Sequence, residues 1–395
     1  MLPDVPDFDI YAIDHLPEKL IVAEQRLIIT WDDGKISHYP FVWLREYSPD
    51  AGTFNDITRE QNIAVTDLPD KLNISSTEIG ADGSVIVNWQ PENLDSRYHP
   101  GWLRAHCPSN PKPNFELPKR TLWTATRTAA SQTFPPTFSG AQIDTDKEFS
   151  EWLGALHSSG VAVITDLPIA PEALEKVVDR IGPIRTSNFG RIFDVELKAE
   201  TNSNAYTSQP LRAHTDLATR EYQPGLQFFF CMENSVSGGE TILTDGLAVA
   251  EKIRTDHPDE YAFLTEQPIP FVNTDRDSEY RYEVPILETD HHGDITTVRF
   301  TYWLRAPMTG DLATLDSLYS ALRLFHHYAD HEDYQLRFPL KPGDLIGVDN
   351  RRVLHGRTGF APDAGHRWLR GCYMEREELE SRLRVLDRQR RIRSA

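Results

Sequence analysis

Short strand-like runs dominate the C-terminal two thirds of this chain and constrain its fold more than any other feature. They combine β-branched and aromatic residues between turn signals, and they read GLQFFFCM, ETILTD, HGDITTVRFTYW, GDLIGVD, RVLHG and LRGCYM. Amphipathic helical patterns occur at 146–159 and 171–182, from Leu247 to about Leu264, from about Leu312 to His331, and from Glu375. Because strands and helices do not alternate one by one, the pattern predicts a mainly β fold, a double-sheet jelly roll with covering helices, rather than βαβ units.

The sequence pattern changes twice along the 395 residues, a length that exceeds the usual span of one hydrophobic core. Residues 20–105 contain short alternating segments separated by turn signals, among them RLIITW, FVWLREY and ADGSVIVNWQ. Residues 108–140 are rich in Pro, Ser and Thr and have no sustained periodicity. We therefore expect a small β-rich N-terminal domain at 1–107, a surface linker at 108–140 and a jelly-roll domain at 141–395.

The charge and the cysteine content exclude several classes of partner and site. The chain has 41 Lys and Arg against 60 Asp and Glu, a formal net charge of −19, which disfavours nucleic acid and anionic membranes as partners. Cys107, Cys231 and Cys372 form no pairing pattern, so we expect a reducing cytoplasm and neither disulfides nor a cysteine zinc site. No run approaches about 18 apolar residues, so we expect no membrane span.

A His-any-Asp pattern can supply two ligands to one metal ion, and it occurs at 214–216, 257–259, 292–294 and 331–333. In the second, His257 precedes Pro258 at a predicted helix start; the third lies in a predicted hairpin turn and the fourth at a predicted helix end. The first, His214 and Asp216, lies where a loop enters the predicted buried strand GLQFFF. In an extended segment residues i and i+2 point to the same side, so both side chains can meet one ion.

A third metal ligand is expected from another strand of the roll, and His355 in DNRRVLHGRTGF is the best candidate. Two His and one carboxylate on one face of a metal, with three positions left open, are typical of non-haem Fe(II) oxygenases, although the same ligands could bind zinc. Arg367, twelve residues after His355, lies in the next predicted strand. Its guanidinium can pair bidentately with a dicarboxylate that also binds the metal.

Several longer stretches resemble a known family, and they read SNFGRIFDVELKAETNSNAYTS, HTDLATREYQPGLQFFF, GGETILTDG, DNRRVLHGR and RGCYMEREEL. The chain resembles the γ-butyrobetaine dioxygenase family of Fe(II)/2-oxoglutarate oxygenases, within the taurine-dioxygenase-like group. FVWLREY and YHPGWLRAH extend this resemblance into the family's N-terminal domain. It implies a distorted double-stranded β-helix, often a homodimer, that uses Fe(II) with 2-oxoglutarate and O2 as co-substrates.

The resemblance also implies roles for individual residues. His214, Asp216 and His355 would bind iron, while Thr241 and Arg367 would hold the distal carboxylate of 2-oxoglutarate. The 2-oxoglutarate would be converted to succinate and CO2 as the substrate is hydroxylated. The family binds a trimethylammonium group in an aromatic cage, and the matching positions are Phe189, Phe193, Tyr206 and Tyr373. Ring faces suit a quaternary ammonium because it cannot donate a hydrogen bond.

Two departures from the family pattern change what is expected. The family's N-terminal domain carries a zinc site of three Cys and one His, whereas the corresponding stretch here reads REYSPDAGTFND and only His99 remains, so a structural zinc is unexpected. In TYWLRAPM, Tyr302 replaces the Asn that the family uses for the substrate carboxylate. The acidic end of the substrate is therefore expected to differ.

Several arginines lie in segments that could approach this acidic end, namely Arg191, Arg212, Arg299 and Arg305. A phosphonate has three acceptor oxygens and up to two negative charges, so it gains more from added donors than a carboxylate does. Relatives in the family hydroxylate 2-(trimethylammonio)ethylphosphonate beside phosphorus, and the sequence favours this substrate over the alternative, γ-butyrobetaine. Two hypotheses from other classes stay open: a roll that only binds a betaine, and a zinc hydrolase.

Overall fold

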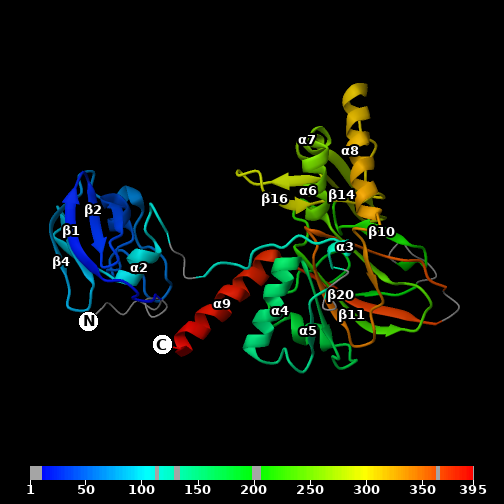
Figure 1. The fold of residues 1–395 in the computed structure, drawn as a ribbon, viewed down its shortest axis with the longest axis horizontal. Helices are drawn as coiled ribbons and strands as arrows, with labels where there is room; N and C mark the ends of the chain where they lie inside the picture. Colours follow the sequence, from blue (N-terminus) through cyan, green and yellow to red (C-terminus); the bar gives the residue numbers. More distant parts are fainter. Residues whose placement is uncertain (1–10, 112–114, 129–133, 198–205, 362–364, 395) are drawn as a thin grey trace. The chain divides into compact units, whose positions relative to one another are not determined.

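The computed structural model describes residues 11–111, 115–128, 134–197, 206–361 and 365–394. The chain divides into two compact units, Met1–Glu116 with Asp387–Ala395, and Leu117–Leu386 (Figure 1). Each unit has its own hydrophobic core and is described by itself. Over the described ranges, no helix has both the length and the apolar character needed to cross a membrane.

The first unit contains two three-stranded antiparallel sheets, ordered β1-β2-β3 and β4-β5-β6. Their strands are β1 (Pro17–Ala23), β2 (Arg26–Trp31), β3 (Ile36–Pro40), β4 (Asn73–Ile79), β5 (Val85–Gln90) and β6 (Leu94–Tyr98), followed by α2 (Pro100–Ala105). Buried residues alternate with less buried ones in β2 and β5, and the buried Trp31 and Trp89 belong to one core. This alternation is the pattern from which a small β-rich domain was predicted.

The segment FVWLREY is a helix, although its aromatic and β-branched residues favoured a strand. α1 (Phe41–Glu46) buries Phe41 and Leu44 against the core, whereas Val42 is 49% exposed. Residues i and i+3 share one face of a helix, while in a strand residues 41 and 44 would point to opposite faces. The three-residue spacing therefore decides the conformation here.

A buried guanidinium orders the loop that follows α1. Arg45 donates to the Glu92 carboxylate from Nε at 3.0 Å and from Nη2 at 2.8 Å, and to Thr53 Oγ1 from Nη1 at 2.6 Å. Asp50 accepts from Thr53 Oγ1 at 2.8 Å and from two backbone N–H groups. Nδ1 of His99 accepts from the first turn of α2. Hydrogen bonds thus hold the segment that corresponds to the family's zinc-binding stretch.

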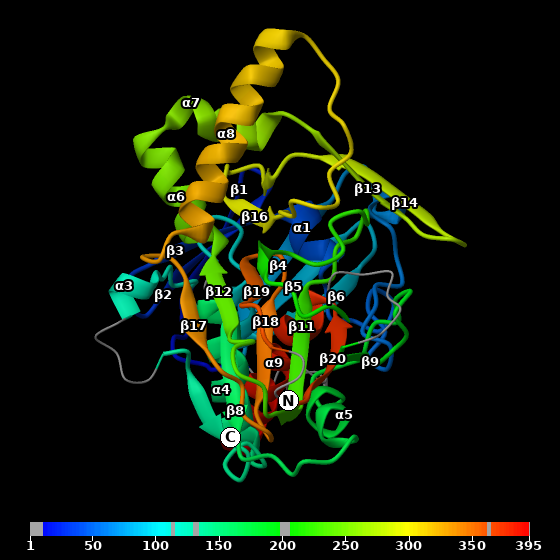
Figure 2. The same cartoon turned by 90° about the vertical axis from the view of Figure 1, so that its right-hand side faces the viewer.

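Two sheets form the jelly roll of the second unit (Figure 2), and the predicted mainly β fold is confirmed. The larger sheet has the order β7-β8-β18-β11-β20-β9, with β7 (Thr137–Ser139), β8 (Val161–Thr165), β9 (Phe193–Val195), β11 (Leu226–Asn234), β18 (Leu345–Asp349) and β20 (Arg367–Met374). The smaller has the order β10-β19-β12-β17, with β10 (Leu211–His214), β12 (Thr241–Asp245), β17 (Leu336–Phe338) and β19 (Val353–Arg357). Ile346 and Leu369 of the larger sheet share a buried cluster with Leu243 of the smaller one.

Helices and two hairpins surround the roll. Those gathered at one end of the strands (Figure 2) are α6 (Gly246–Asp256), α7 (Pro258–Glu266) and α8 (Leu312–Asp330), with the hairpins β13 (Ile269–Thr274)–β14 (Glu279–Val284) and β15 (Leu287–Thr289)–β16 (Ile295–Val298). Further helices in the described residues are α3 (Ala125–Thr128), α4 (Asp146–Ser159), α5 (Ala173–Val178) and α9 (Arg376–Ser394), of which the part from Asp387 belongs to the first unit. The stretch predicted as one helix from Leu247 is two helices, because Pro258 begins α7 and cannot continue α6.

Part of the predicted linker belongs to the second unit. β7 pairs in parallel with β8, and Trp123 is only 2% exposed, with its Nε1 donating to the carbonyl of Ser159 at 2.8 Å. The composition of residues 108–140 did not reveal that part of this segment packs in the second unit, because a three-residue strand and one buried Trp produce no periodicity.

Candidate active site

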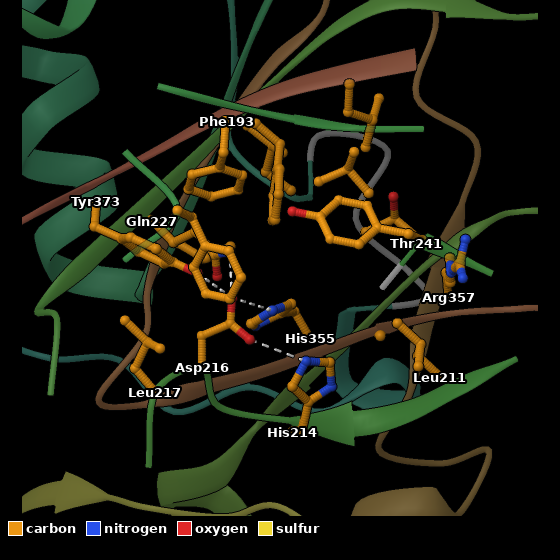
Figure 3. A pocket seen from close by; sticks show the side chains of 18 of the residues that line it. Phe193, Leu211, His214, Asp216, Leu217, Gln227, Thr241, His355, Arg357 and Tyr373 are labelled. Atoms are coloured by element: carbon orange, nitrogen blue, oxygen red, sulfur yellow. Dashed lines mark hydrogen bonds and ion pairs between the residues drawn. The ribbon is translucent and has the colours of Figure 1, made fainter. Parts of the chain in front are cut away.

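β10 and β19 bring the three predicted metal ligands together. His214 ends β10 and is the register partner of His355 in β19, and Asp216 follows two residues later. His214 Nε2 lies 3.3 Å from Asp216 Oδ1, and His355 Nε2 lies 3.7 Å from Asp216 Oδ2 (Figure 3). All three side chains can therefore reach one ion, and two imidazoles with one carboxylate suit Fe(II).

The other His-any-Asp patterns lie outside the cavity that the three metal ligands line. The second begins α7, and the third lies in the turn between β15 and β16. His331 and Asp333 pair with each other at 3.5 Å and are 41% and 62% exposed. In the described part of the chain, one further group has metal-ligand spacing, and it lies at the surface: His15, Asp32 and Asp33.

The larger sheet fixes the Asp216 carboxylate. Its Oδ2 accepts hydrogen bonds from Gln227 Nε2 and from the Tyr373 hydroxyl, both at 2.7 Å. Gln227 and Tyr373 are register partners in β11 and β20, so the sheet presents the two donors side by side (Figure 3). Asn350 accepts from the backbone N–H of Asp216 at 2.7 Å. Oδ1 is left for a metal ion.

Gln227 and Asn350 were missed by sequence reasoning. A polar signal exists for Gln227, which is the one hydrogen-bonding side chain within the apolar run GLQFFF and is fully buried. Asn350 follows directly after β18 and is also fully buried. A buried polar side chain is nearly always hydrogen-bonded, so a Gln or Asn at a buried position indicates that it binds another polar group, here Asp216.

The protonation states favour metal binding. Burial alone would raise the pKa of Asp216, but the neighbouring His214 and His355 outweigh it and hold the pKa well below its usual range. Burial also lowers the pKa of His355. His214 Nδ1 lies 2.9 Å from the carbonyl of Arg212, which can only accept, so Nδ1 carries the proton and Nε2 faces the metal site. An ionised carboxylate and imidazole nitrogens that carry no proton are the forms that bind a metal.

Arg357 and Arg367 are buried arginines that line the same cavity as Tyr373. Arg367 is 6% exposed, and its Nε has no hydrogen-bond partner among the residues with described positions. Arg357 also lines the cavity, and burial, followed by the charge of Arg367, lowers its pKa to about 10. Thr241 lies beside Arg357, as its register partner in β12 (Figure 3). Two guanidiniums with a hydroxyl suit a dicarboxylate such as 2-oxoglutarate.

The GGET turn places backbone directly over Arg367. Gly239 has φ +68°, and a Cβ at this position would lie 3.2 Å from both Cδ and Nε of Arg367. A larger residue would therefore strain the backbone and crowd the guanidinium. Arg357 was missed from the sequence, although it follows His355 by two residues and so shares its face of β19.

One cavity of about 460 Å³ is lined both by the metal ligands and by all four predicted cage residues. The cage residues are Phe189, Phe193, Tyr206 and Tyr373. The ring of Phe193 lies 6.0 Å from that of Phe189 and 5.0 Å from that of Tyr373. Tyr302 does not line the cavity. Its neighbour Trp303 does, with its ring 4.5 Å from that of His214. The residue expected to replace the family's Asn is therefore outside the cavity lining.

None of the four arginines expected near the acidic end of the substrate lines the cavity. Arg191 and Arg212 form surface ion pairs at 2.7 and 3.3 Å. Arg299 is buried and donates to backbone carbonyls. Arg305 lies near α8, where burial and then its charge lower the pKa of His326 to about 4. The segments that carry these arginines do not bring them into the cavity lining, because position along the chain does not give side-chain direction.

A double-sheet roll with two His and one carboxylate beside a cavity that also holds two buried arginines defines an Fe(II)/2-oxoglutarate-dependent dioxygenase. Residues 126–373 match the taurine catabolism dioxygenase TauD, TfdA family, and residues 19–91 match the gamma-butyrobetaine hydroxylase-like N-terminal model. The chain belongs to the TauD/TfdA dioxygenase family. Its cofactor is Fe(II), and its co-substrates are 2-oxoglutarate and O2.

Individual relatives match nearly the whole chain. The gamma-butyrobetaine dioxygenase of Pseudomonas sp. (strain AK-1) is 39% identical over 91% of this chain and 93% of its own. The Homo sapiens gamma-butyrobetaine dioxygenase is 27% identical over the same shares. The trimethyllysine dioxygenase of Meyerozyma guilliermondii is 25% identical over 95% of this chain and 97% of its own. The predicted family resemblance and enzyme class are confirmed, so the binder and zinc-hydrolase hypotheses are set aside.

Proposed function

We propose that this enzyme hydroxylates a small trimethylammonium compound with an acidic end, and that the compound is γ-butyrobetaine. The aromatic wall carries this proposal, because Phe189, Phe193, Tyr206 and Tyr373 line the cavity that holds the metal ligands. Each ring face contributes roughly 0.5–2 kcal/mol to binding a desolvated cation. The similar relatives are named for γ-butyrobetaine and for trimethyllysine, and both compounds carry a trimethylammonium group.

Different side chains of the cavity bind the metal, the co-substrate and the substrate in this proposal. His214, Asp216 and His355 would hold Fe(II), which when bound supplies O2 activation coupled to decarboxylation of 2-oxoglutarate. Arg367 and Thr241 would hold the distal carboxylate of the co-substrate, with Arg357 beside them adding a second positive charge. The aromatic wall would orient the substrate, and the apolar lining of the cavity would limit water around the reacting carbon.

The acidic end of the substrate separates two candidates. The sequence favoured 2-(trimethylammonio)ethylphosphonate, but that argument depended on arginines that do not line the cavity. A carboxylate needs fewer donors than a phosphonate, and the relative with 39% identity is named for a carboxylate substrate. We therefore place γ-butyrobetaine first and keep the phosphonate as the rival that the experiment must separate.

Direct competition tests the proposal. Enzyme, Fe(II) and 2-oxoglutarate are incubated with equal amounts of the two compounds, and hydroxylated products are followed by mass spectrometry. We expect hydroxylated γ-butyrobetaine to predominate and to vanish in Asp216→Ala, whereas Asp294→Ala in the β15–β16 hairpin leaves it unchanged. Predominant phosphonate hydroxylation would reverse the order of the candidates. Hydroxylation of neither compound would refute the assignment of the aromatic residues as a trimethylammonium-binding cage.

Two further parts of the proposal concern organisation. We place the oxygenase function in residues 141–395, completed by β7 from the preceding segment. The homodimer that the family resemblance implies should give twice the mass of one chain in light scattering after size-exclusion chromatography. A single-chain mass would refute it.

A further inference from the structure

Arg220 lies just outside the cavity lining, to which it is joined by a hydrogen bond, on the loop that carries Asp216. Its Nη2 donates to Asn188 Oδ1 at 2.7 Å, and its Cζ lies 3.2 Å from the ring centroid of Tyr280 in β14. Asn188 lines the cavity and is exposed, which places it where the cavity opens. The guanidinium is therefore one hydrogen bond away from the entrance.

The charge of Arg220 is not neutralised by the described residues around it. No carboxylate of the described chain forms an ion pair with it, and its buried Nε has no hydrogen-bond partner there. By contrast, Arg191 and Arg370 each pair with an acidic side chain. A guanidinium held in place by an amide and a ring, with donors left over, is suited to an anion that comes from outside.

The two arginines of the cavity lining do not serve this purpose. Arg357 and Arg367 lie on the side of the cavity that we assign to 2-oxoglutarate, which itself carries two negative charges. The acidic end of a second molecule would need a separate cation. Arg220 is next to the lining and follows Asp216 by four residues, so it is tied to the same loop as the metal site.

We propose that Arg220, together with Asn188, binds the acidic end of the substrate and selects a singly charged carboxylate. This inference rests on the proposed function and deepens it. Asp275, in the turn of the β13–β14 hairpin, lines the same cavity and is exposed, so it also lies where the cavity opens. Like charges repel, and Asp275 therefore opposes the second negative charge of a phosphonate more than the single charge of a carboxylate.

The first test compares γ-butyrobetaine with its primary amide, which keeps the trimethylammonium group and the length but has no negative charge. In Arg220→Met we expect kcat/KM for γ-butyrobetaine to fall about tenfold or more, while the value for the amide changes less than about threefold. The KM for 2-oxoglutarate should stay unchanged. The control is Arg281→Met in the same hairpin, a 70% exposed arginine paired with Glu279, which should alter neither value.

A purely structural role for Arg220 predicts a different result. If Arg220 only ties the Asn188 loop to the hairpin, Arg220→Met lowers kcat/KM for acid and amide equally, and Tyr280→Leu, which removes the ring contact but keeps the charge, does the same. That outcome would overturn the inference. The inference is supported if Tyr280→Leu keeps the preference for the acid over the amide and Arg220→Met loses it.

Asp275→Asn tests the charge selection separately. We expect the ratio of phosphonate to γ-butyrobetaine hydroxylation to rise at least about threefold, and an unchanged ratio would remove Asp275 from the inference. Wild-type hydroxylation of γ-butyrobetaine with unchanged selectivity in Arg220→Met would overturn the role of Arg220 and leave the proposed function intact. If the wild type hydroxylates no trimethylammonium compound, the proposed function fails and this inference with it.

Discussion

Replacing Tyr373 by Phe removes one hydroxyl and leaves the aromatic ring in place, so it separates two roles of the same side chain. The hydroxyl donates to Asp216 Oδ2 at 2.7 Å, while the ring lies 5.0 Å from that of Phe193 in the aromatic wall. We expect the metal site to weaken and the cage to survive.

The size of the loss follows from the hydrogen bonds. A hydrogen bond to a charged group contributes about 1.5–3 kcal/mol, and loss of a partner that orients a metal ligand usually weakens metal affinity by about 10–100-fold. Gln227 still donates to the same oxygen at 2.7 Å, so the lower limit is the better estimate. Tyr373→Phe should therefore raise the dissociation constant for Fe(II) about tenfold, with the substrate KM changed less than about twofold.

Anaerobic titration with Fe(II), repeated with Mn(II), measures the affinity, and initial rates at saturating metal give the substrate KM. Gln227→Leu and the double variant complete a cycle. Because the double variant leaves Oδ2 without either donor, its loss should exceed the sum of the single losses. Unchanged metal affinity together with a raised substrate KM would assign Tyr373 to the cage alone and refute the reasoning.

Other predictions test the co-substrate site, the core and the pH response. Arg367→Met should raise the KM for 2-oxoglutarate at least tenfold, and Arg370→Met, which loses only a pair with Asp194, should not; equal rises would contradict the assignment. Arg352→Met leaves Asp245 buried without its 2.9 Å ion pair, so urea denaturation should show about 3–5 kcal/mol less stability, and a loss below about 1 kcal/mol would be inconsistent with that role. Burial lowers the pKa of His326 to about 4, below the value near 6.5 in the unfolded chain, so the unfolded state takes up the proton first. Stability should therefore fall from pH 6.5 to 4, by up to about 3 kcal/mol, and the fall should shrink in His326→Gln; the same fall in the variant would exclude His326 as its cause.

The metal triad was predictable because few residues in this sequence combine the right side chain with a position next to a buried strand. Only the first His-any-Asp pattern adjoins a buried strand, and the required third ligand pointed to His355. The register of β10 against β19 then places these residues opposite one another. In such a case residue type, spacing and strand direction all constrain the same site.

The surroundings of the triad were less predictable, because they depend on side-chain direction in irregular segments. Tyr302 and Trp303 are neighbours in the sequence, yet only Trp303 lines the cavity. Arg220 lies within a quoted motif but outside any strand, so no alternation rule assigned it a side. For α1, the general strand preference of its residues was overridden by tertiary burial of Phe41 and Leu44.

The loop after α1 also bears on how this enzyme can be prepared and supplied with metal. Its hydrogen bonds between Arg45, Thr53, Asp50 and Glu92 belong to the chain itself, and the stretch REYSPDAGTFND contains no cysteine. Chelators should therefore remove iron from His214 and its partners without loosening this loop, and oxidants have no thiol to attack there. Apoenzyme can then be prepared and reloaded with other divalent ions for spectroscopy, with near-ultraviolet circular dichroism reporting that the aromatic side chains, Trp31 and Trp89 among them, remain packed.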